Sequence, residues 1–171
     1  MSLFGVNFKN QLVGGTDHAA LFAGILPDGI LRGCAMSAAG STLTLGAGYL
    51  IAAGRLIGND AALNIPVSGS SGVARAVLVI DLSAAATAET FEQATIRVDT
   101  AESVGALPVL TQEDINGSGT IYELALCTMV LGSTGVTSVT EKLGTACRVI
   151  RFGTATPTAA TLPEGEIYIK L

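Results

Sequence analysis

Positive charge is scarce in this sequence of 171 residues. It contains nine Lys and Arg against 14 Asp and Glu, which gives a formal net charge of −5. Surfaces that bind nucleic acid neutralise phosphates with clusters of Lys and Arg, and anionic membranes are held by similar clusters. The sequence has no such basic stripe. We therefore expect neither nucleic acid nor a membrane surface as a partner.

Long apolar runs are also lacking, although 49% of the residues are hydrophobic and the mean hydropathy is +0.56. Gly, Asp or Arg interrupts each run before the roughly 20 residues that a spanning helix needs. The N-terminal sequence MSLFGVNFKN has no hydrophobic signal core. We expect the protein to be assembled in a cytoplasm, and we expect it not to insert into a membrane. A mean hydropathy this high indicates apolar surface that is buried between subunits.

Cysteine, histidine and tryptophan are rare. The three cysteines, Cys34, Cys127 and Cys147, are odd in number and widely spaced, which argues against a disulfide framework and favours buried free thiols. The single histidine, His18, cannot complete a usual zinc site. We expect no metal and no cofactor.

Residues suited to catalysis do not form a recognisable group. Asp17 and His18 are adjacent, but no G-x-S-x-G nucleophile motif accompanies them, and His18 is expected on a helix surface. Neighbouring Glu113 and Asp114 seldom face each other across a cleft as glycosidase acids do, and they lack the D-x-D-x-D-G pattern of a calcium loop. We expect a solvated loop there, no catalytic residues and no enzymatic activity.

Two further patterns bear on possible binding sites. Residues 46–48, Gly-Ala-Gly, superficially resemble a phosphate loop, but no Lys-Ser/Thr pair follows them and a turn is the simpler interpretation. Tyr49, Tyr122 and Tyr168 are too few and too scattered to predict a platform for sugar rings.

Residues 119–131, GTIYELALCTMVL, form the longest β-type run and predict a central strand covered on both faces. Strict alternation places Glu123 on one face with Cys127 and Met129, and Leu124 and Leu126 on the other. Glu123 is expected in solvent near the beginning of the strand.

One helix is expected over residues 16–24, capped by Thr16 or Asp17, with Ala19, Phe22 and Ala23 as its apolar side. Residues 49–57 read as a single strand, in which Gly54 marks a bulge or a close backbone approach.

Many further short strands with Gly-rich turns complete the pattern. They are expected at residues 34–37, 41–45, 62–67, 74–82, 94–100, 136–140, 147–152 and 166–171. Together they predict an all-β sandwich or barrel of short antiparallel strands with one short N-terminal helix. We divide the chain into an N-terminal arm and helix (1–24), a β-rich domain (25–150) and a C-terminal extension with a closing strand (151–171).

Several phrases, in their order and spacing, resemble the β module that begins many tail-fibre or receptor-binding proteins of long-tailed bacteriophages and prophages. These phrases are GILPDGILRG (24–33), SAAGSTLTLGAGYLIAAGRLI (37–57), ARAVLVIDL (74–82), PVLTQ (108–112) and IYELALCTMVLGSTGVTSVTE (121–141). The resemblance covers most of residues 24–147.

The resemblance implies a virion structural protein of the tail or baseplate that contacts other tail proteins and lacks catalytic residues. Such proteins are homo-oligomeric, usually trimeric or built into larger rings. Residues 140–142 are Thr-Glu-Lys where the family often has Asp-x-Arg, and the sequence ends without a long fibre region. These departures favour an assembly or fibre-attachment role over direct host binding. The alternative is a receptor-binding module that recognises carbohydrate on the host cell surface.

Overall fold

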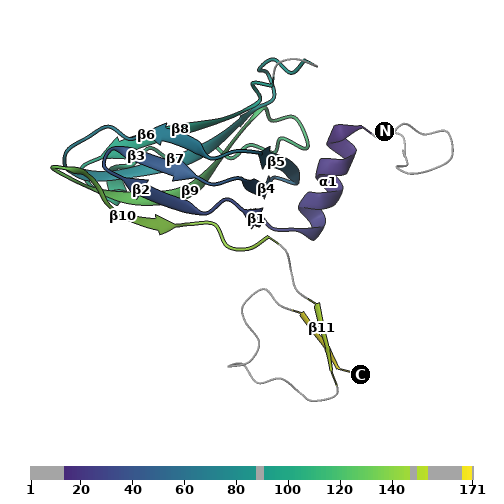
Figure 1. Ribbon diagram of the computed structural model, residues 1–171. Helices are drawn as coiled ribbons and strands as arrows, with labels where there is room; N and C mark the ends of the chain where they lie inside the picture. Colours follow the sequence, from purple (N-terminus) through teal and green to yellow (C-terminus); the bar gives the residue numbers. More distant parts are fainter. Residues whose placement is uncertain (1–13, 88–90, 147–149, 154–166, 171) are drawn as a thin grey trace.

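The computed structural model describes residues 14–87, 91–146, 150–153 and 167–170. Most of these residues lie in antiparallel strands, with one short helix, so the predicted all-β class is confirmed (Figure 1). The elements are α1 (Gly15–Ile25), β1 (Gly29–Gly33), β2 (Met36–Ala39), β3 (Thr42–Leu45), β4 (Gly48–Ala52), β5 (Arg55–Asn59), β6 (Leu63–Pro66), β7 (Gly72–Asp81), β8 (Ala94–Ala101), a 3-10 turn (Val104–Ala106), β9 (Ile121–Gly132), β10 (Gly135–Glu141), β11 (Ile150–Gly153) and β12 (Ile167–Lys170).

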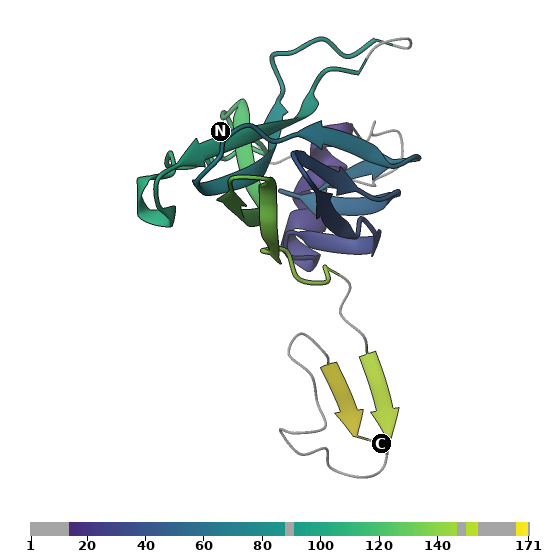
Figure 2. The same ribbon diagram turned by 60° about the vertical axis from the view of Figure 1, so that its left-hand side comes forward.

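Two layers of strands form a sandwich (Figures 1 and 2). One layer is a four-stranded sheet in the order β10-β9-β7-β8. The other consists of two three-stranded sheets, β2-β3-β6 and β1-β4-β5. Backbone hydrogen bonds from Cys34 to Ala47 and from Gly46 to Ala35 join these two sheets. Residues 46 and 47 connect β3 to β4, and Gly48 is the first residue of β4.

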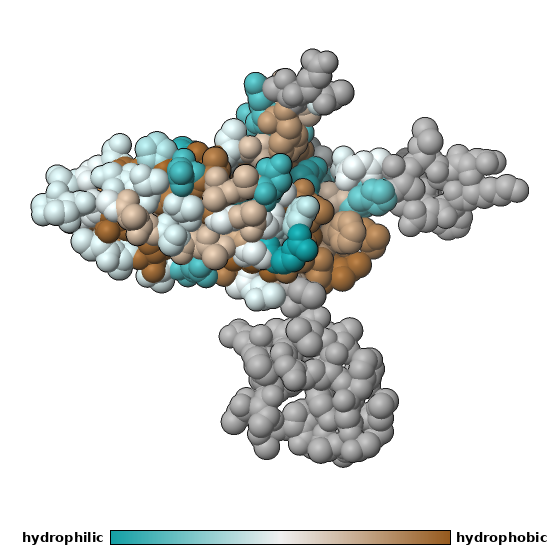
Figure 3. Space-filling model, viewed as in Figure 1, coloured by the Kyte–Doolittle hydropathy of each residue, from teal (hydrophilic) through white to brown (hydrophobic). Residues whose placement is uncertain are grey.

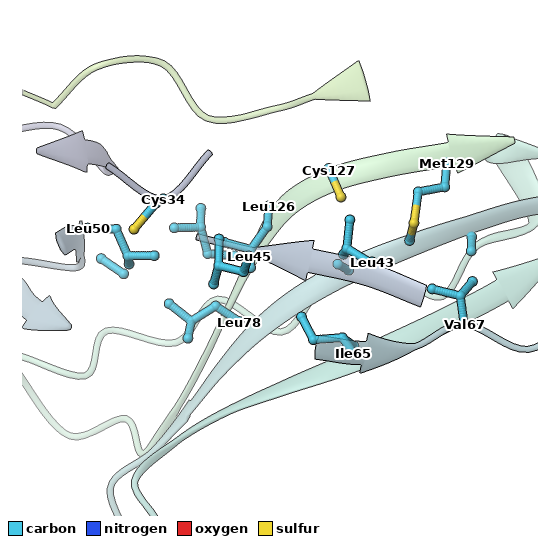
Figure 4. Packing of buried hydrophobic residues seen from close by; sticks show 14 of the residues in the cluster. Cys34, Leu43, Leu45, Leu50, Ile65, Val67, Leu78, Leu126, Cys127 and Met129 are labelled. Atoms are coloured by element: carbon cyan, nitrogen blue, oxygen red, sulfur yellow. The ribbon is translucent and has the colours of Figure 1, made fainter. Parts of the chain in front are cut away.

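The core lies between the layers (Figure 4). Leu43 and Leu45 of β3 face Leu126, Cys127 and Met129 of β9 across it. The alternating apolar side chains of β7 complete it from the same sheet as β9: Ala74, Ala76, Leu78 and Ile80. Cys34 and Cys127 are buried free thiols, as predicted, and burial raises the pKa of Cys127 to about 11. Cys147 lies outside the described residues.

The alternation predicted for β9 is wrong across its middle. Ala76 of β7 is opposite Cys127, whereas Val77 is opposite Ala125, so Leu126 is an extra residue in β9. This bulge exchanges the two faces of the strand. Leu124 before the bulge, Leu126 within it, and Cys127 and Met129 after it consequently all reach the core.

Residues 49–57 form two strands rather than one. β4 and β5 pair as a hairpin, and the turn between them contains Ala53 and Gly54 with φ angles of 48° and 76°. Gly54 does mark the close backbone approach that was predicted, because a Cβ there would lie 1.8 Å from the carbonyl oxygen of Ala19 in α1. Only glycine lets the helix sit this close to the turn.

The predicted C-terminal strands are present as β11 and β12, which pair in parallel. Residues 1–13, 88–90, 147–149, 154–166 and 171 lie outside the described part of the chain. The division at residues 24 and 150 stays a prediction. Within the described residues, no helix has the length and apolar character needed to cross a bilayer.

Candidate interaction surface

Glu123 is buried, which contradicts the expectation that it lies in solvent. It is 6% exposed and accepts hydrogen bonds from the Arg97 side chain at 2.6 Å and from the backbone N–H of Thr111 at 2.9 Å. The loop after β8 covers this face of β9 at Thr111, so Glu123 lies beneath the loop and not at an open strand end. Sequence alternation alone could not reveal that the loop covers this face.

Asp99 on β8 joins Glu123 in a network of two carboxylates and two guanidinium groups. Its carboxylate contacts Arg97 at 2.7 Å and Arg75 at 2.8 Å. Arg75 also donates to the carbonyl oxygen of Pro108 in the covering loop. Because the two charges of each sign compensate each other, the network fastens the loop to the sheet and is not poised to bind a charged ligand.

The pKa values agree with this structural role. The hydrogen bond from Arg97 lowers the pKa of Glu123, with burial opposing it. Burial alone would raise the pKa of Asp99, but the hydrogen bonds and charges of Arg97 and Arg75 lower it overall. Both carboxylates therefore remain charged at neutral pH and hold their arginine partners.

A second polar network lies where β4, β5 and β9 meet. Tyr122 donates a hydrogen bond of 2.6 Å to Asp28, which also accepts one from the backbone of Ala53. Asn116 accepts from Arg55 and donates to the carbonyl oxygen of Ala53. Burial and Asp28 raise the pKa of Tyr122 to about 12, so it stays a protonated donor. This network fixes the β4–β5 turn on which α1 packs.

The other candidate residues from the sequence have simple structural roles. Glu113 and Asp114 are exposed in a loop, as predicted, and their carboxylates accept hydrogen bonds from backbone N–H groups of residues 116, 117, 120 and 121. His18 is exposed on α1. Tyr49 is 42% exposed, and its ring lies beneath the Arg32 guanidinium. Tyr122 donates a hydrogen bond to Asp28 at a different place, so these two tyrosines do not form one platform for sugar rings. In residues 14–87, 91–146, 150–153 and 167–170, no group of His, Cys, Asp and Glu could hold a metal.

The large apolar side chains of helix α1 are mostly exposed, which the sequence did not predict. Ala19 is its one buried residue, while Leu21, Phe22 and Ile25 are 51%, 44% and 57% exposed. Apolar residues gather over this helix in Figure 3. Ala19, Phe22 and Ala23 do share one side of the helix, because Ala19 and Ala23 approach the Gly54 turn and Ala19 and Phe22 line one cavity, but Ala19 alone is buried. The available signal was the position of Leu21 and Ile25 outside that side, which makes the helix apolar nearly all round.

The cap of α1 also differs from the prediction. Gly14 is the N-cap, and Asp17 accepts a hydrogen bond of 2.8 Å from its backbone N–H. The helix ends at Ile25, where Leu26 donates to the carbonyl oxygen of Phe22. Asp17 therefore contributes to the cap from the first turn. Thr16 lies inside the helix.

A groove begins beside α1 and continues along one edge of the sandwich. A cavity of about 560 Å³ lies between α1, β5 and the start of β8, lined by Gly15, Phe22, Leu56, Ile57, Phe91 and Ala94 among others. A second cavity of about 150 Å³ shares Ile57 and Ala94 with it and continues to Ile96, Leu63 and Leu126. The lining is chiefly aliphatic and aromatic, which suits an apolar protein segment.

Together, the exposed side of α1 and this groove form the candidate interaction surface. A comparison of the sequence with models of protein families finds no match, and a comparison with curated protein sequences finds none.

Proposed function

We propose that this protein is a structural component of a bacteriophage or prophage tail, acting as a homo-oligomeric assembly or fibre-attachment module without enzymatic activity. The observation that carries the proposal is the exposed apolar side of α1, formed by Leu21, Phe22 and Ile25. The trimer is the stoichiometry that we favour, and other tail proteins are its further partners.

Helix α1 needs a covering surface for physical reasons. It has 11 residues, and isolated helices shorter than about 12–15 residues are marginal in water. It contacts the Gly54 turn through the backbone of Ala19 and Ala23. Three large apolar side chains on a short helix indicate a partner that buries them, and a second copy supplies such a surface by symmetry.

The assignment to a tail rests on the ordered phrases between residues 24 and 141 that resemble tail-fibre modules. The all-β sandwich is compatible with such a module. The paired charges of Arg75, Arg97, Asp99 and Glu123 support a role without catalysis, because the arginines and carboxylates hold one another and the covering loop.

Solution mass tests the oligomer. Light scattering coupled to size exclusion should give a mass near three times the 17.2 kDa of one chain. The double variant Leu21→Glu, Ile25→Glu should be monomeric, because two carboxylates would be buried in the interface. The matched control, Val109→Glu, changes a valine that is 93% exposed in a different loop and should keep the mass of the wild type. A wild-type monomer would overturn the oligomer.

The tail assignment needs a separate test. Particles purified after induction of a host that carries this gene should contain the protein in their tails, in a fixed ratio to the other tail proteins, by quantitative mass spectrometry. Its absence from such particles would overturn the tail assignment even if the protein is a trimer in solution.

A further inference from the structure

The groove along β8 leaves the sandwich core incomplete on one edge. The side chains of β8 that face the core, Ala94, Ile96 and Val98, are only half-buried. Leu78 and Ile80 on the neighbouring strand β7, by contrast, are each 3% exposed. Half-buried apolar residues at every second position of an edge strand mark a place where another apolar element packs.

The backbone on this side is open as well. β8 ends the four-stranded sheet, and β5 and β6 end the two sheets of the facing layer. Within the described residues, no hydrogen bond links β8 to β5 or β6. A strand at the edge of a sheet presents unpaired N–H and C=O groups, which is how extended segments are bound by strand addition.

The N-terminal sequence has the pattern that fits such a place. In MSLFGVNFKNQLV, Phe4, Val6 and Phe8 alternate with Gly5 and Asn7. In an extended segment these three apolar side chains point to one face at intervals of two residues. Ala94, Ile96 and Val98 of β8 have the same spacing, so the two rows can pack against each other in register.

Residues 2–9 are also tethered close to the groove. Gly15 and Thr16 line the larger cavity, and Gly14 joins them to residues 1–13. The linking residues 10–13 span up to about 14 Å when extended, and the eight residues of β8 extend over about 27 Å. A segment tethered this closely has an effective concentration in the millimolar range, above that of any separate copy.

We propose that residues 2–9 of the same chain bind in this groove as an added strand along β8, with Phe4, Val6 and Phe8 inserted between the two layers. The inference is independent of the proposed tail function, because it concerns one copy. It assigns the groove to the chain's own N-terminus and leaves the outer side of α1, with Leu21 and Ile25, for a second copy.

The absence of tryptophan from the sequence allows a direct test. The variant Phe8→Trp should emit at shorter wavelength and resist iodide quenching, compared with Val109→Trp at a position that is 93% exposed. Adding Ile96→Lys in the groove should shift the emission of Phe8→Trp to longer wavelength and restore quenching. Val130→Lys, on β9 and outside the groove lining, is the matched control and should change neither.

Two further measurements keep the outcome clear. Replacing Phe4 and Val6 by Ser should expose the indole of the Phe8→Trp variant as Ile96→Lys does, without touching the folded body. Tenfold to hundredfold dilution should leave the emission unchanged, also in the monomeric Leu21→Glu, Ile25→Glu background. Emission like that of Val109→Trp, insensitivity to Ile96→Lys, or loss of the blue shift on dilution would each overturn the proposal, the last by showing binding to another copy.

Discussion

The two edges of the sandwich are completed in opposite ways. At the edge of β10, β2 and β1 the chain joins the layers itself: Val136 donates to Gly40, and Met36 donates to the Glu141 carboxylate. The segment after β10 then pairs with β1, because Ile30 donates to Gly144 and Ala146 donates to Ile30. At the edge of β8, β5 and β6 the described residues leave an apolar groove.

The difference shows that backbone closure, and not apolar content alone, completes the core. Val136, Val139 and Leu143 at the closed edge pack on the core much as Ile96 and Val98 do at the open edge. Only the first group is followed by chain that crosses to the other layer. We conclude that the closed edge stabilises the fold, while the open edge is available to a further strand.

The largest expected effect on stability comes from a substitution that disrupts the closed edge. Gly135 has a φ angle of 113°, and a Cβ there would lie 2.2 Å from the carbonyl oxygen of Gly40. Gly135→Ala should lower the free energy of unfolding by more than about 2 kcal/mol, measured by urea denaturation. Gly58→Ala at the open edge is the matched control: its Cβ would meet only the exposed ring of Tyr49, and its cost should stay below about 1 kcal/mol. Equal costs would contradict the comparison.

A smaller effect concerns the charges that hold β8 from its outer side. Arg97 lowers the pKa of the Glu123 carboxyl in the folded state. The ion pair therefore stabilises the fold fully above the unfolded pKa of about 4.3, and this stabilisation is lost as the pH falls through the folded pKa. Glu123→Gln should cost about 1–3 kcal/mol in urea unfolding at pH 7 and much less at pH 3. The exposed Glu102→Gln is the control and should cost little at either pH. A loss for Glu123→Gln that does not change with pH would show that the ion pair is not its cause.

The smallest effect compares one leucine at each edge. Leu143 packs on the core at the closed edge, whereas Leu63 of β6 is 44% exposed at the open edge. Leu143→Ala should cost about 1–2 kcal/mol in thermal or urea unfolding, and Leu63→Ala less than about 1 kcal/mol. If Leu63→Ala is the more costly, the open edge is better packed than the described residues show.

The sequence predicted the fold well where alternation is local and regular. The strands expected at residues 74–82 and 94–100 correspond to β7 and β8 within two residues at each end. It failed where a long-range contact decides the geometry. The bulge at Leu126 and the covering loop over Glu123 depend on partners more than ten residues away, and the same holds for the turn at Gly54 beneath Ala19.

The candidate surface was harder to predict, for a related reason. The excess of apolar residues indicated buried interfaces. Only the structure shows that the side chains of Leu21 and Ile25 are exposed and that the core-facing side chains of β8 are half-buried. The alternation of Phe4, Val6 and Phe8 has meaning only beside a groove with the same spacing.

Hydrogen exchange at the two edges tests the central claim most directly. Full-length wild-type protein should be compared with the variant Phe4→Ser, Val6→Ser, Phe8→Ser by mass spectrometry of peptides from β8 and β10. We expect β10 to exchange slowly in both proteins, and β8 to exchange slowly in the wild type but markedly faster in the variant. Equal, slow exchange of β8 and β10 in both proteins would contradict the account, because it would mean that the edge at β8 is not open.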